Sequence, residues 1–166
     1  MKRVLQAVFL LLLVGAWIQA GWQHSRLPAR VASHFNAAGH ANGWMTRDAQ
    51  FGWQVGPVTF LAFIFFGISW LQPRLPREFV NLPHRDFWLA PERRAATDAW
   101  ISGLLFACGS LVMAFLIYLF HLVYCANLTA NPRLPAGFGA AGILLVLLLI
   151  GMVLTVVFRF ARTPPA

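Results

Sequence analysis

The sequence has little charge and few acidic residues. Only 11% of its 166 residues are charged, Asp and Glu together number 5, and 59% of the residues are hydrophobic. A typical soluble domain carries about 25% charged residues, so this composition excludes a water-soluble globule. The mean hydropathy of +0.66 and the long apolar runs indicate an integral membrane protein instead.

Cysteine is also scarce. Cys108 and Cys125 are the only two, and both fall in the third apolar run. On one helix they would lie about 25 Å apart, too far for a disulfide between them. There is no CxxC pair, which excludes a zinc ribbon or a dithiol redox site. We expect two free, buried cysteines that pack against their neighbours, and the alternative is an intermolecular bond through Cys125.

Four apolar runs predict four membrane spans, at about 4–20, 55–71, 100–125 and 138–158. The first follows Lys2 and Arg3, and a bulky Ile18 stands where signal peptidase prefers a small residue, which favours a retained helix. We therefore predict an all-α membrane protein, one integral membrane domain over 1–166. Four transmembrane helices form it, with a structured outer loop at 21–54 and a cytoplasmic loop at 73–97.

The basic residues predict the orientation of these spans. Nine of the 13 Lys and Arg residues fall on one side: Lys2, Arg3, Arg74, Arg77, Arg85, Arg93, Arg94, Arg159 and Arg162. The other four, Arg26, Arg30, Arg47 and Arg133, fall on the opposite side. The positive-inside rule then puts both termini in the cytoplasm and the 21–54 loop outside. We expect a multi-pass protein of the bacterial inner (cytoplasmic) membrane.

Two helices are expected to begin before their apolar runs. Thr46 is a typical N-cap, and Asp48 would lie in the first turn, where an acid stabilises the helix dipole. Pro91 followed by Glu92 indicates a second such start. Pro57 is expected at a kink or at the beginning of a helix.

The outer loop contains the patterned stretch LPARVASHFNAAGHANGW at 27–44. Alternating side chains predict a short half-buried strand over 31–36, and Gly39 and Gly43 offer two places for positive φ. A compact loop of this kind leaves polar and aromatic groups free to bind a ligand or a partner. The candidates are His34, Asn36, His40, Asn42 and Trp44.

Histidines gather on the expected outer side. Imidazole is the commonest transition-metal ligand, so His34, His40 and His121 are candidate metal ligands. No HExxH or helical HxxxH pair supports this hypothesis, and the alternative is hydrogen bonding in the loop and at the membrane interface. The sequence identifies no cofactor.

The cytoplasmic loop carries a second patterned stretch, NLPHRDFWLAPERR at 81–94. Aromatic residues between arginines are typical of a segment that lies at the membrane interface. The functional alternative is a docking surface formed by Arg85, Asp86, Trp88, Glu92 and Arg93.

The two stretches resemble a bacterial membrane domain of unknown function over about residues 1–130. That domain also forms the N-terminal part of the immunity proteins that protect cells from the sporulation-delaying-protein toxin, and the chain resembles its short, four-span members. The matching residues are Pro28, His34, Phe35, Gly39, Gly43 and Trp44 in the first stretch, and Pro83, Asp86, Trp88, Pro91, Glu92 and Arg93 in the second. We expect the chain to lack the second domain of the immunity proteins, so the resemblance implies an immunity role only weakly.

These observations favour a non-enzymatic binding, sensing or immunity-like module that recognises a peptide, a lipid or a partner protein through its outer loop. The alternatives are a metal-binding or metal-dependent protein that uses the outer histidines, and a small subunit of a larger membrane complex. An enzyme is not favoured, because Asp48 is the one acid expected outside and acid–base catalysis commonly needs a pair. The expected partners are the lipid bilayer and either another membrane protein or a second copy. Nucleic acid is not expected, because the basic residues flank the spans.

Overall fold

The computed structural model describes residues 1–162 and is built on four long helices. They are α1 (Lys2–His24), α2 (Arg47–Leu71), α4 (Pro91–Asn127) and α5 (Phe138–Phe160). Each is long and apolar enough to cross a membrane. The predicted all-α class with four spans is therefore confirmed. The described residues also contain one small sheet of two short strands, which does not change this class.

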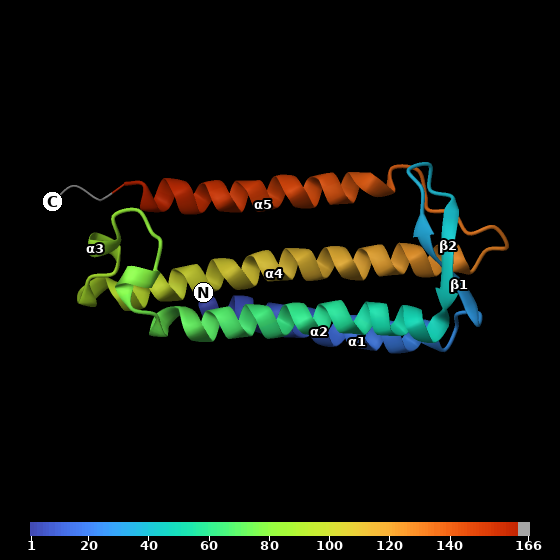
Figure 1. Ribbon diagram of the computed structural model, residues 1–166, viewed down its shortest axis with the longest axis horizontal. Coiled ribbons are helices and arrows are strands. Elements are labelled where there is room, and N and C mark those ends of the chain that lie inside the picture. The colour runs from blue at the N-terminus through green and yellow to red at the C-terminus, as the bar shows by residue number, and fades with distance from the viewer. Residues whose placement is uncertain (163–166) are drawn as a thin grey trace.

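The four helices lie lengthwise beside one another (Figure 1). Helices α1, α2 and α4 share a core around Phe9, Val58, Phe106 and Met113, all of them buried. Gly109 lets Phe9 approach α4, since a Cβ there would lie 2.9 Å from its ring. Helix α5 packs beside α4 and keeps most of its apolar side chains exposed, as expected of a helix that faces lipid.

The outer loop folds into a hairpin of strands β1 (Arg30–Phe35) and β2 (Ala41–Thr46), which pair antiparallel. The predicted strand over 31–36 is thus confirmed to within one residue, although its partner strand was not predicted. Gly39 has the expected positive φ of 81° in the turn. Gly43 does not, so that prediction was wrong; instead, a Cβ on Gly43 would lie 2.9 Å from the His34 side chain.

Both predicted helix starts are confirmed. The Thr46 hydroxyl accepts a hydrogen bond from the Ala49 amide at 3.1 Å, and Asp48 lies in the first turn of α2. Pro91 begins α4, with Glu92 in its first turn. Cys108 and Cys125 are both free, as predicted, but the expectation that both are buried was wrong, because Cys108 is partly buried and Cys125 is exposed.

One side chain fixes the hairpin to the bundle. Asn127, the last residue of α4, accepts a hydrogen bond from the Ala32 amide at 2.6 Å and donates to the Ala32 carbonyl at 2.9 Å. The same amide nitrogen also lies 2.9 Å from the carbonyl of Val123. The loop that follows joins the hairpin through the Leu134 amide, which donates to Gly39. We call this end of the bundle the hairpin end.

The opposite end, which carries Met1 and the end of α5, is called the terminal end. The segment after α2 contains short turns, η1 (Gln72–Arg74), η2 (Arg77–Phe79) and α3 (Arg85–Trp88). Buried Asp98 of α4 accepts a hydrogen bond from Gln72 at 2.6 Å and pairs with Arg94 at 3.5 Å. The hydrogen bond from Gln72 holds the end of α2 against α4, and Arg94 on α4 balances the charge of Asp98.

Replacement of Asn127 should release the hairpin. An Asn127→Ala change leaves the amide and the carbonyl of buried Ala32 without partners, and each unsatisfied group costs about 1–3 kcal/mol. We expect a lower Tm in detergent and faster hydrogen exchange at the Ala32 amide. Asn131→Ala, at an exposed position on the next loop, is the control and should change neither. An unchanged exchange rate at Ala32 would contradict the role given to Asn127.

Candidate functional site

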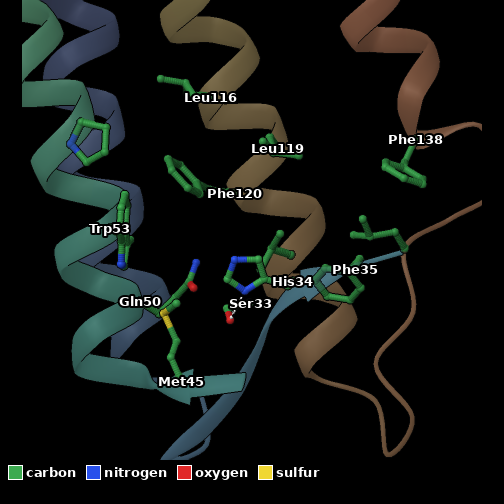
Figure 2. Close-up of a pocket in the computed structure, with 13 residues that line it drawn as sticks. Ser33, His34, Phe35, Met45, Gln50, Trp53, Leu116, Leu119, Phe120 and Phe138 are labelled. Atoms are coloured by element: carbon green, nitrogen blue, oxygen red, sulfur yellow. Dashed lines mark hydrogen bonds between the residues drawn. The ribbon is translucent and has the colours of Figure 1, made fainter. Parts of the chain in front are cut away.

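A pocket of about 420 Å³ lies beneath the hairpin, between α2 and α4 (Figure 2). This volume is within the range of roughly 300–1,000 Å³ that small-molecule sites occupy. Its lining comes from the hairpin, α2, α4 and the α4–α5 loop, with Phe138 from the first turn of α5. The residues are Ser33, His34, Phe35, Met45, Gln50, Trp53, Pro57, Leu116, Leu119, Phe120, Val123, Leu134 and Phe138.

The pocket is apolar where it extends into the bundle. Its walls there are Trp53 and Pro57 of α2 and Leu116, Leu119 and Phe120 of α4. Gln50 and Pro57 are two helical turns apart, so these walls run about 10 Å along the helix axis. Figure 2 shows Leu116 at the far end from the hairpin. The apolar part therefore belongs to the lengths of α2 and α4 that can cross a membrane.

Polar groups gather at the hairpin side of the pocket. Ser33 Oγ lies 3.0 Å from His34 Nδ1, and both side chains come from β1. Gln50, in the first turns of α2, is only 5% exposed, and Figure 2 shows its amide in the space between α2 and α4. Within residues 1–162 this amide makes no hydrogen bond to another protein group. The polar atoms of Gln50 are not among the fully buried side-chain atoms that lack a partner, so the amide is accessible from the pocket and can hydrogen bond to a ligand there.

The next glutamine along the same face of α2 is paired. Gln54 Nε2 donates to Gln23 Oε1 of α1 at 3.0 Å, and both residues are buried. Gln54 thus links two helices, whereas Gln50, one turn earlier, faces the pocket. Sequence reasoning missed Gln23, Gln50, Gln54 and Asn127. The i, i+4 spacing of two glutamines at the start of a span is the signal that could have found the α2 pair.

The five outer-loop candidates are not brought to one place. His34 lines the pocket, whereas His40 and Trp44 line a separate cleft with Arg133 on the hairpin surface. The side-chain oxygen of Asn36 accepts hydrogen bonds from the amides of Ala38 and His40, each at 3.0 Å, so this side chain shapes the turn. Asn42 is exposed.

The three histidines predicted as metal ligands are also separated. His34 lines the pocket, His40 bridges to Arg133 through its backbone, and His121 Nε2 lies 3.5 Å from Cys125 Sγ. In the described part of the chain, no group of three or more His, Cys, Asp or Glu residues could hold a metal ion. Metal binding by His34, His40 and His121 stays a prediction from the sequence.

The candidates of the 81–94 stretch lie at the terminal end, far along the bundle from the pocket. Trp88 packs edge to face on Phe160, with ring centroids 5.2 Å apart. Arg93 lies 4.1 Å above the ring of Phe87 and 3.2 Å from Glu92. Arg85 and Asp86 are exposed on α3. Trp88 therefore packs α3 against α5, and the other four residues remain available on the surface.

The close approach of Gly43 to His34 generates a prediction. In Gly43→Ala the new Cβ would clash with His34 Cβ and Nδ1, so we expect the ring to move and its NMR signals to shift, with a lower Tm. Gly52→Ala on α2 is the control, because nothing lies within 4 Å of its Cβ. It should instead stabilise α2 by roughly 0.5–1 kcal/mol. Unshifted His34 signals in Gly43→Ala would refute the predicted clash.

Part of the chain matches a known family model. Residues 11–55 match the model of a family described as "Domain of unknown function (DUF1648)". The matched segment covers part of α1, the whole hairpin and the first turns of α2, and it includes His34 and Gln50. No curated protein and no solved structure matches the chain. The match supports a membrane family of unknown function for this four-span protein.

Proposed function

We propose that the protein is a non-enzymatic binding module that takes a small ligand into the pocket beneath the hairpin. The observation that carries this proposal is Gln50, a 5% exposed amide that faces a 420 Å³ pocket and has no hydrogen-bond partner within residues 1–162. Both the oxygen and the NH₂ group of this amide are accessible from the pocket, so a ligand can pair with Gln50 without breaking a hydrogen bond within the protein.

The polar groups of the pocket favour binding over catalysis. Ser33 and His34 are close enough for a nucleophile and its base, but such a pair commonly needs a third group to orient the imidazole. Among the described residues that line the pocket there is no Asp or Glu. Hydrogen bonding to a ligand is therefore the simpler role for Ser33 and His34.

The proposal includes an orientation in the bacterial inner membrane, with both termini in the cytoplasm and the hairpin outside. Its support is the excess of nine basic residues over four between the two sides of the spans. A pocket at the hairpin end would then meet ligands of the outer leaflet or of the outside medium. Sensing and immunity-like roles both require access of this kind, and the resemblance to immunity proteins is their further support.

Cysteine labelling tests the orientation. In a Cys108→Ala, Cys125→Ala background, Ala38→Cys lies on the exposed hairpin turn and Ala95→Cys on the exposed start of α4. A membrane-impermeant maleimide should label position 38 in intact cells and position 95 only after permeabilisation. The reverse pattern would refute the orientation.

Native mass spectrometry after extraction in mild detergent tests ligand binding. The wild-type protein should carry a bound mass, and Leu119→Trp should lose it because the indole would fill the pocket. The matched control is Leu147→Trp on α5, a position that is 60% exposed and outside the pocket; it should keep the bound mass. Equal occupancy in both tryptophan variants would refute the proposed pocket.

The two glutamines of α2 separate binding from folding. Gln50→Leu breaks no hydrogen bond within the protein, so its Tm should be unchanged or higher while the bound mass is reduced. Gln54→Leu should lower the Tm, because it removes the hydrogen bond to buried Gln23. A Gln50→Leu protein that is as unstable as Gln54→Leu would show that Gln50 has a structural role.

A further inference from the structure

We infer that the pocket beneath the hairpin binds an uncharged amphiphile with one apolar chain, of the monoacylglycerol type, which enters from the surrounding lipid. This inference rests on the proposed function and names the class of its ligand. It follows from three properties of the pocket: the charge of its lining, the position of its polar groups, and the side on which it opens.

The lining carries no fixed charge. Among the 13 described residues that line the pocket there is no Lys, Arg, Asp or Glu. A buried charged group needs a partner of opposite charge, and moving it out of water without one costs far more free energy than burying a neutral polar group. A phosphate or carboxylate headgroup would find no such partner at this site. An uncharged headgroup meets no such penalty.

The polar groups can both donate and accept hydrogen bonds. The carboxamide of Gln50 offers an oxygen and an NH₂ group. Beyond their mutual contact, the Ser33 hydroxyl keeps two hydrogen-bonding sites and the His34 ring keeps its Nε2. Hydroxyl and ester groups of a glycerol headgroup match this mixture. These side chains lie at one end of the pocket, and apolar walls begin within two turns of Gln50, so a ligand must be polar at one end only.

The pocket opens towards the region where lipid chains would lie. Its apolar walls come from α2 and α4, and of the described residues of α5 it is Phe138 alone, at the hairpin end, that contributes to the lining. Figure 1 shows α4 between α5 and the α1–α2 pair. Helix α5 packs on α4 rather than on α2, so the pocket is not covered by an α2–α5 interface beyond Phe138. An apolar chain can enter there and lie along Trp53, Leu116 and Leu119 without crossing water.

Photocrosslinking tests this inference in the full-length protein. The protein is reconstituted in phosphatidylcholine vesicles that contain a monoacylglycerol with a diazirine in its acyl chain. After irradiation, we expect crosslinks at positions 116–123 of α4 and near Trp53. An excess of unlabelled monoacylglycerol should reduce them at least fivefold. Crosslinks on the lipid-facing positions 143–157 of α5 report non-specific contact and should not be competed, which makes them an internal control.

Variants and headgroup analogues complete the experiment. Gln50→Leu and Leu119→Trp should each reduce the competed crosslinks at least fivefold, whereas Leu147→Trp should leave them unchanged. A fatty acid and a phosphatidylglycerol that carry the same diazirine chain should crosslink α5 equally well but give no competed signal at 116–123.

Three outcomes would overturn the inference. Equal or stronger competed crosslinking by the charged analogues would show that the site selects an anionic amphiphile. Uncompeted labelling by every lipid, together with a bound mass that Leu119→Trp removes, would show that the pocket binds another class of ligand such as a peptide, and the proposed function would stand. Uncompeted labelling without any bound mass would refute the inference and the proposed function together.

Discussion

The pairing of Asn127 with Ala32 determines where the hairpin lies, and the pocket depends on it. A strand at the end of a membrane bundle exposes backbone groups that need partners where water is scarce. Asn127 satisfies both groups of Ala32 with one carboxamide, in the manner of a neighbouring strand. Ser33 and His34 are the next residues of β1 after Ala32, so the contact with Asn127 also holds their side chains over α2 and α4.

Buried carboxamides serve opposite purposes at this end of the protein. Asn127 and Gln54 are paired with protein groups and join segments distant in the chain, whereas Gln50 faces the pocket with no partner in the described residues. The amide of Gln50 is accessible from the pocket and joins no two segments of the chain, so it contributes hydrogen-bonding groups to the pocket rather than a link within the fold.

The sequence predicted the four spans, because long apolar runs are a strong signal, and it predicted the starts of α2 and α4 from Thr46 and Pro91. His34, which lines the pocket, was identified as a candidate, but the other outer-loop candidates, such as His40 and Trp44, lie on the hairpin surface outside the pocket. The reason is physical: the pocket joins residues about 80 positions apart, such as His34 and Leu116, and no local pattern reports which helix faces pack. The prediction of positive φ for Gly43 failed for a similar reason. This glycine is needed for its close contact with His34 on the opposite strand, which the local sequence does not report.

The division of the pocket between two parts of the chain bears on specificity. Residues 11–55, which match the family model, supply the polar end of the pocket, formed by Ser33, His34 and Gln50. The apolar wall from Leu116 to Val123 and the fixing residue Asn127 come from α4, outside that match. The polar end of the proposed site therefore depends on the matched segment, and the length and shape of its apolar part depend on α4. In the proposed site, the hairpin and α2 would select the headgroup of the amphiphile, and α4 would select its apolar chain.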